Sequence, residues 1–340
     1  MNLVNLGVKH FFANPLSKAV GHSTFFAASL LVATMTVGSM PVQAAPAPLQ
    51  VGVNMWVGWM PWWIVEQKGL LKKQHVNAKL KFFGVQSESM NALAAGHLDA
   101  CSLATNDVIS VNRVSKVASI VLLNDESSGA DLLVTREIQS GKELKGQKIA
   151  VELGGVSHFF LDKILEKNGL SEKDVVLTNM TAADAGAAFV AKRINAAVTW
   201  EPYGSQALKS GGVALFTSKA TPNAIVDVLT FRNEVINKRP EDVKKLVQVW
   251  FEAMKFIETN PDEAFAIMAK ASSVTVPEFK EMWRGVKMYT LKDNMDAFGS
   301  VAQPGPYFKT VDEMSTFMVK QKLIDHPVSA KSMLDARFLN

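Results

Sequence analysis

Between residues 49 and 199, short apolar segments alternate with segments of helical periodicity. Leu49–Met55 alternates apolar residues with small or polar ones, as a β-strand does. Val156, Phe159 and Ile164 share one face of a helix. Strands that alternate with helices predict parallel sheets with helices on both faces. We expect strands at 49–55, 80–83, 98–103, 118–123, 148–152, 174–178 and 194–199, and helices at 61–71, 87–95, 156–167 and 182–192.

The last third of the chain has a different pattern. Apolar residues recur every three or four positions over 243–257, which predicts a long amphipathic helix with Pro240 near its start. Residues 260–263 combine a cap, a proline and an acid, and start a second helix. Pro277 and residues 310–313 mark two further helix starts. We therefore expect a helical layer here, with its aromatic residues in the core, and no third sheet domain.

The N-terminal segment has the features of a secretory signal. Lys9 and Lys18 make it basic. An apolar stretch follows at 25–37, and residues 42–44 form an A-x-A-like cleavage site. A transmembrane anchor, the alternative, needs about 20 apolar residues, and this stretch is shorter and interrupted by serine and threonine. We expect residues 1–44 to be a cleaved signal peptide.

The composition excludes several classes of protein. The 36 basic and 32 acidic residues are dispersed, and no Lys/Arg block indicates nucleic-acid binding. Cys101 is the only cysteine, which excludes an intramolecular disulfide and a cysteine-based zinc site. The four histidines of the expected mature chain, His75, His97, His158 and His326, show no metal-ligand spacing, and His158 is interpreted as a helix-start residue. The chain has no G-x-S-x-G elbow and no Walker loop. We expect no catalysis, no cofactor and no metal.

An internal echo indicates where a ligand would bind. At a shift of 96 residues the chain repeats a helix, a tight turn and a short strand of small residues. Three pairs of segments align at this shift: 90–100 with 186–196, 56–59 with 152–155, and 105–106 with 201–202. The shorter segments fall just after a strand, at or near a helix start. Ligands of open α/β sheets bind at these strand ends, where unpaired N–H groups favour an anion. Two such lobes that face each other would make a cleft.

Several motifs then occur in a specific order. They are Trp59-Met60-Pro61-Trp62 with residues 66–71, Gly96–Ala100, Gly129-Ala130-Asp131, Glu143–Val151 and Ala196–Pro202. Their order and spacing resemble the periplasmic solute-binding proteins of ABC importers, of the nitrate, taurine and aliphatic-sulfonate type, which also includes pyrimidine-precursor binders. The resemblance covers about Pro48 to Phe279.

This resemblance implies an α/β fold of the periplasmic binding protein-like type II. Such a fold has two Rossmann-like lobes, a hinge and, here, a C-terminal helical layer. Residues 48–130 with 228–340 would form lobe 1, and residues 131–227 would form lobe 2. Two departures concern the site: Asn195 stands where the family usually has an acid, and the 154–157 loop lacks a hydroxyl directly after its first glycine.

The implied function is the substrate-binding component of an ABC importer. It would act in the periplasm as a monomer, capture a small organic solute and deliver it to a permease in the inner membrane. The family favours taurine or another sulfonate. Alternatives are a binder of a nitrogenous cation or pyrimidine precursor, a secreted enzyme on the same fold, and a secreted sensor domain.

The candidate site residues lie in the predicted loops at the strand ends. Trp56 and Trp59 form an apolar wall or pack on a cation, whereas at least one of Trp62 and Trp63 belongs to the core. Glu201 is a counter-charge for an amine or a helix-start carboxylate. The candidate ligand-binding residues are Trp56, Trp59, Met60, Gln86, Ser87, Thr105, Asn106, Ser128, Gly155, Val156, Ser157, Trp200, Glu201 and Asp227. Capping is the alternative role for Ser87, Asn106 and Ser157, and a hinge position is the alternative for Asp227.

Overall fold

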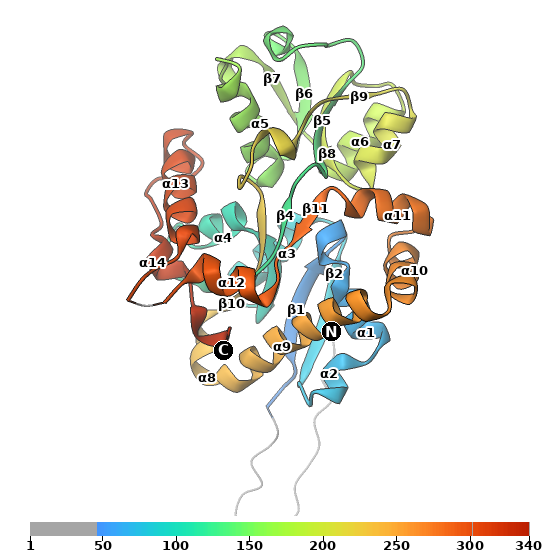
Figure 1. The fold of residues 1–340 in the computed structure, drawn as a ribbon. Helices are drawn as coiled ribbons and strands as arrows, with labels where there is room; N and C mark the ends of the chain where they lie inside the picture. The colour runs from blue at the N-terminus through green and yellow to red at the C-terminus, as the bar shows by residue number, and fades with distance from the viewer. Residues whose placement is uncertain (1–45, 301, 340) are drawn as a thin grey trace, which may run out of the picture. The chain divides into compact units, whose positions relative to one another are not determined.

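The computed structural model describes residues 46–300 and 302–339 (Figure 1). The expected signal peptide, residues 1–44, lies outside the described residues. In the part of the chain that the structure describes, no helix is both long enough and apolar enough to cross a membrane.

The first sheet has six strands in the order β11-β4-β10-β3-β1-β2. β1 pairs in parallel with β2 and β3, whereas β10 runs antiparallel to both β3 and β4. The bounds are β1 (Leu49–Asn54), β2 (Ala78–Phe83), β3 (Ala100–Ala104), β4 (Ala118–Ser127), β10 (Val226–Arg232) and β11 (Val286–Met288).

The second sheet has five strands in the order β7-β6-β8-β5-β9. β6 pairs in parallel with β7 and β8, and β5 runs antiparallel to β8 and β9. The bounds are β5 (Asp131–Thr135), β6 (Lys148–Val151), β7 (Val176–Asn179), β8 (Ala196–Trp200) and β9 (Val213–Thr217).

Both sheets are mixed, so the expectation of purely parallel sheets is wrong. The chain passes from the first sheet to the second between β4 and β5, and returns between β9 and β10 (Figure 1). β5 and β10, the first strands after each crossing, run antiparallel to β8 and β3 respectively. The alternation of strands and helices alone could not indicate this direction. The α/β class with two sheets is confirmed. The lobe boundaries at residues 130 and 228 stay a prediction.

The helices between the strands follow the repeated pattern closely. α3 begins at Gln86 and α6 at Ala182, and the strands after them begin at Ala100 and Ala196. Both pairs differ by the 96 residues of the echo. The helix expected over 61–71 is interrupted because Gly69 adopts a left-handed conformation, with φ of 62°, between α1 and α2. The bounds are α1 (Pro61–Gln67), α2 (Leu70–Lys73), α3 (Gln86–Ala94), α4 (Thr105–Val111), α5 (Val156–Lys167), α6 (Ala182–Val190), α7 (Tyr203–Lys209) and α8 (Asn233–Lys238).

The C-terminal third is mainly helical, as expected. The helix expected to start at 310–313 begins earlier, at Pro306, and α12 was not anticipated. α12 starts at a capping box of Thr290 and Asp293, a signal present in the sequence. The bounds are α9 (Pro240–Thr259), α10 (Pro261–Ala271), α11 (Val276–Trp283), α12 (Leu291–Phe298), α13 (Pro306–Lys320) and α14 (Ala330–Met333).

A tryptophan pair joins α9 to the start of the chain. The rings of Trp62 and Trp250 are fully buried, with centroids 5.1 Å apart. Trp62 Nε1 donates to Ser102 Oγ at 2.9 Å, so its polar atom is satisfied inside the core. Truncation of such a ring costs about 3–5 kcal/mol of stability. Trp62 is therefore a core residue, and Trp63 is half-buried against Phe82, with centroids 4.1 Å apart.

Candidate ligand-binding site

Two adjoining cavities lie where strands of both sheets end and the next helices begin. The main cavity spans about 520 Å³ and the side cavity about 430 Å³, including the space that opens to solvent. Gln86, Glu152, Val156 and Trp200 line both cavities, so we treat the two as one cleft. The main cavity is lined by Asn54, Met55, Trp56, Trp59, Gly84, Val85, Gln86, Asp131, Glu152, Val156, Thr181, Ala182, Ala183, Trp200, Tyr203, Ile225 and Asp227. The side cavity is lined by Gln86, Ser87, Met90, Asp107, Glu152, Leu153, Gly154, Gly155, Val156, Ser157 and Trp200.

Aromatic rings form much of the main cavity wall. Trp56 caps and Trp59 ends the short 3₁₀ helix η1 (Val57–Trp59), which follows β1. Trp56 is 6% exposed, and its Nε1 donates to Asp125 Oδ1 at 2.9 Å, which fixes the ring. Trp59 Nε1 is buried without a hydrogen-bond partner. Trp200 and Tyr203 contribute half-buried rings from the second sheet's side. Such rings suit planar or cationic groups.

Two buried aspartates face the main cavity from the strands next to the sheet crossings. Asp131 is the first residue of β5 and is 2% exposed, and its Oδ2 has no hydrogen-bond partner. Burial raises the pKa of Asp131 to about 7, and the charge of Glu201 adds to this, while the Ser127 hydroxyl lowers it. Asp227 on β10 is 4% exposed. Burial, and then the neighbouring Asp125 and Asp131, raise the pKa of Asp227 well above its usual range.

Two further carboxyl groups face the side cavity. Gln86 Nε2 donates to Asp107 Oδ2. Burial raises the pKa of Asp107 to about 7, and the charge of Glu152 contributes to the rise. Burial also raises the pKa of Glu152, which the backbone N–H of Ala182 and the hydroxyl of Ser87 partly offset. Burial therefore shifts the pKa values of all four carboxyl groups upward, and those of Asp107 and Asp131 lie at about 7.

The described residues that line the two cavities include no lysine, arginine or histidine. The cleft thus has several carboxyl groups and no side-chain cation to pair with them. It also offers free acceptors, since Asn54 Oδ1 and Asp131 Oδ2 are buried without a donor. Ser157 Oγ in the side cavity is likewise without a partner. Unpaired buried acceptors cost free energy, so this arrangement is suited to a ligand that donates hydrogen bonds.

The structure brings nine of the predicted site residues together. Six line the main cavity: Trp56, Trp59, Gln86, Val156, Trp200 and Asp227. Ser87, Gly155 and Ser157 line the side cavity with three of those six.

Four predicted residues, Met60, Thr105, Asn106 and Ser128, lie outside both linings. Met60 is 2% exposed and belongs to the core. The Thr105 hydroxyl donates to the Val226 carbonyl at 2.7 Å. Asn106 Nδ2 donates to an oxygen of Asp107 at 3.2 Å, one shell behind the side cavity. The Ser128 N–H donates at 2.7 Å to a carbonyl near β11.

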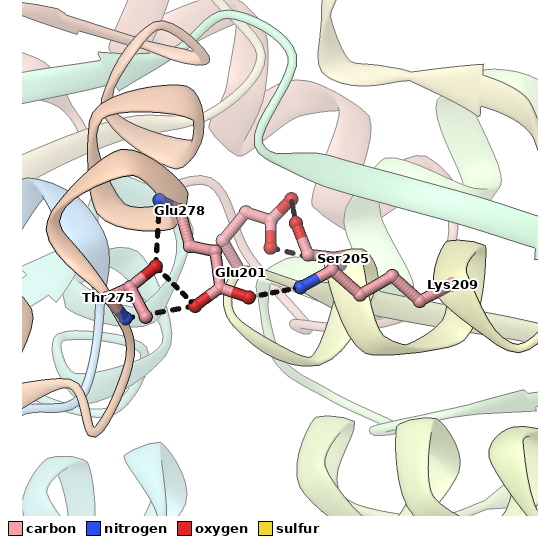
Figure 2. Close-up of polar contacts among 5 residues, drawn as sticks. All are labelled: Glu201, Ser205, Lys209, Thr275 and Glu278. Carbon is pink, nitrogen blue, oxygen red and sulfur yellow. Dashed lines mark hydrogen bonds and ion pairs between the residues drawn. The ribbon is translucent and has the colours of Figure 1, made fainter.

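Glu201 is also outside the lining, and its carboxylate is already occupied (Figure 2). Its two oxygens accept from the N–H and the hydroxyl of Ser205, at 3.0 and 2.9 Å. This is the helix-start role at α7, not that of a free counter-charge. Figure 2 also shows Lys209, at the end of α7, paired with Glu278 of α11, whose other oxygen accepts from Thr275.

Sequence reasoning missed the residues that give the cleft its charge, above all Asp131 and Glu152. Both stood in quoted segments: Asp131 ends the Gly129-Ala130-Asp131 motif, and Glu152 aligns with Trp56 at the 96-residue shift. For Glu152 the available signal was a carboxyl that directly follows the strand β6, whereas Asp131 begins the strand β5. Tyr203 had no such signal, because its position depends on where α7 begins.

The known proteins that resemble this chain include two binding proteins and an enzyme. A protein of Escherichia coli K12 named for aliphatic sulfonate binding is 25% identical over 254 residues, which cover 73% of this chain and 79% of that protein. The alkanesulfonate-binding protein SsuA from Xanthomonas axonopodis, bound to MOPS, aligns with a TM-score of 0.72 at 17% identity, covering 86% of this chain and all of SsuA. The desulfurization enzyme DszB aligns with a TM-score of 0.61 at 13% identity, covering 87% of this chain and 98% of the enzyme.

The two solved structures show the same two-sheet fold, which confirms the expected periplasmic binding protein-like class. A profile of the NMT1-like family matches residues 42–273, more than half of the chain. With this match, the chain belongs to the NMT1-like family.

Proposed function

We propose that this protein is the substrate-binding component of an ABC importer and that its solute carries a protonated nitrogen. The observation that carries the proposal is the lining of the main cavity. Asp131, Glu152 and Asp227 meet there with four aromatic rings, and none of the described residues that line the cleft is basic. The solute would then be an organic cation or a zwitterion with an amino group, such as taurine.

The physical reason is the cost of leaving buried charges unpaired. An ammonium donates three hydrogen bonds, and Asp131 Oδ2 and Asn54 Oδ1 are free to accept two of them. A tryptophan face attracts a cation through its ring quadrupole, by about 0.5–2 kcal/mol. A sulfonate without an amine would meet carboxyl groups in both cavities and gain no cationic partner from a side chain. An anionic group on a zwitterion has one favourable position, at Ser157 and the N-terminus of α5.

Contacts between the two halves support capture by closure of the lobes. Lys209 of α7 pairs with Glu278 of α11 on one side of the cleft. Elsewhere α5 meets α13, where Phe159 and Phe317 stack edge to face at 5.1 Å and Glu166 pairs with Lys320 at 2.8 Å. Exposed pairs of this kind contribute little free energy, about 0–1 kcal/mol each. Weak contacts between the halves suit a protein that must close on a solute and reopen at its transporter.

We further propose that the protein acts as a periplasmic monomer, delivers the solute to a permease in the inner membrane and catalyses no reaction. Relatives named as binding proteins support this role. Cys101 is fully buried, and burial raises the pKa of its thiol to about 12, so it supplies no nucleophilic thiolate. The likeness to DszB makes an enzyme the second candidate. Turnover of a bound solute by the purified protein would establish that alternative instead.

A matched pair of solutes tests the proposal. Taurine and 2-hydroxyethanesulfonate differ only in an amino group against a hydroxyl. Calorimetric titration should show taurine, or an amine in a wider panel of cations, binding at least tenfold more tightly than its hydroxyl analogue. Equal affinity for the two members of each pair would contradict a requirement for the nitrogen. Binding of simple alkanesulfonates alone would reverse the assignment.

A further inference from the structure

Three ligating side chains gather behind the cleft, outside both cavity linings. His158 and Asp162 lie one turn apart on the same face of α5. Glu172 begins the 3₁₀ helix η3 (Glu172–Asp174) and approaches from the side. One oxygen or nitrogen atom of each residue lies within 4.8 Å of the others. His158 and Asp162 are 5% and 1% exposed, whereas Glu172 is half-buried and opens toward solvent.

Four polar atoms in this cluster are buried without a hydrogen-bond partner. Both oxygens of Asp162 are buried without a hydrogen bond. His158 Nε2 and Glu172 Oε1 are 2.8 Å apart, yet neither has a hydrogen bond of acceptable geometry. At this distance the two atoms are close enough to bind the same ion. Lys163, the next residue after Asp162, does not supply a hydrogen bond to it. The Lys163 ammonium lies over the Phe317 ring, 3.9 Å from the centroid.

We propose that His158 Nε2, Asp162 and Glu172 bind a divalent transition-metal ion, for which Zn²⁺ is the probe. One imidazole nitrogen and two carboxylates are common zinc ligands, at about 2.0–2.2 Å, and solvent can complete the sphere on the side of Glu172. Ca²⁺ and Mg²⁺ prefer more oxygen ligands and no nitrogen. A bound dication would also favour the charged forms of Asp162 and Glu172.

Binding has a consequence for the cleft. The Gly154 N–H donates to His158 Nδ1 at 3.2 Å. A metal on Nε2 moves the ring proton to Nδ1, which then donates and can no longer accept from Gly154. The turn at Gly154 and Gly155 lines the side cavity, so it must adjust when the metal binds. The Gly154 amide should consequently exchange its hydrogen faster in the zinc-loaded protein.

The test uses the whole mature protein, stripped of metal by a chelator, and is independent of the solute. Native mass spectrometry should show one Zn²⁺ per chain. At a concentration 100-fold above the dissociation constant, zinc should raise the melting temperature by about 5 °C. The same concentration of Ca²⁺ or Mg²⁺ should leave it unchanged.

Variants make the result specific. Asp162→Asn and His158→Gln should each abolish the zinc-dependent rise in melting temperature, and Glu172→Gln, nearer the surface, serves if either misfolds. Glu166→Gln, on the same helix but outside the cluster, should retain the full rise. No stoichiometric zinc, an equal response to Ca²⁺, or an unchanged response in Asp162→Asn would overturn the proposal.

Discussion

Replacement of Asp131 by asparagine should make the ligand-free protein more stable, because burial disfavours the charged form of the wild-type carboxyl. Its pKa is raised from 3.8 to about 7 by burial. Below pH 3.8 the group is protonated in both the folded and the unfolded chain. Between pH 3.8 and 7 the unfolded chain releases the proton and the folded chain keeps it, so stability falls as the pH rises.

The difference between the two pKa values sets the magnitude. At pH 8 it corresponds to a loss of at most about 4 kcal/mol, and at pH 4 to about 0.5 kcal/mol. Asp131→Asn removes this dependence and keeps the side-chain shape. The variant should therefore be more stable than the wild type at pH 8, and nearly equal to it at pH 4.

Urea unfolding followed by tryptophan fluorescence at both pH values measures this difference, with unchanged m-values as the check on comparability. Asp325→Asn makes the same chemical change at an exposed position and should stay within about 0.5 kcal/mol of the wild type. The same Asp131→Asn variant should bind an amine ligand at least tenfold more weakly. A variant that is less stable at pH 8, or whose stability gain is equal at both pH values, would refute this reasoning.

Four further outcomes follow from the cleft. Asp227→Asn should weaken ligand binding at least tenfold by titration calorimetry, whereas Glu201→Gln, whose oxygens are held by its own helix, should weaken it less than threefold. Trp56→Phe keeps a ring but loses the bond to a buried carboxylate, and should lower affinity about tenfold; unchanged affinity would show that the ring alone matters. Lys209→Met removes the ion pair with Glu278 and should speed ligand dissociation about two- to fivefold in stopped-flow traces. The dissociation rate of this variant should no longer depend on the salt concentration. Affinity for an amine should fall by up to about 100-fold from pH 8 to pH 5, because a carboxyl with a pKa of about 7 must release its proton to bind the cation; a flat profile would contradict this.

Local sequence patterns predicted the positions of helices and strands well where the spacing of apolar residues is regular. The apolar spacing on α5 gave its bounds, Val156 and Lys167, without error. The 96-residue shift of the echo is also the shift from α3 to α6 and between the strands after them. The direction of β5 and β10 was not predictable in the same way, because it depends on where the chain crosses between sheets, and no local pattern encodes a crossing.

The candidate site was predicted only in part, because some of its residues have a local signal and others depend on contacts that only the fold creates. Trp56 and Trp59, predicted from their glycine-containing loop, line the main cavity, and their contact with a ligand stays a prediction. The orientation of Glu201 depends on Ser205, one turn along α7, and its sequence neighbours do not reveal it. The acidic character of the cleft arises from Asp131, Glu152 and Asp227, which lie far apart in the chain and meet only through the fold.

The solute that stays with the protein through purification tests the central claim most directly. Native mass spectrometry of freshly purified protein, followed by release and fragmentation of the bound compound, identifies it without a guess. The account predicts a small molecule with a basic nitrogen, as a cation or a zwitterion. A sulfonate, nitrate or other anion without a basic nitrogen would contradict it.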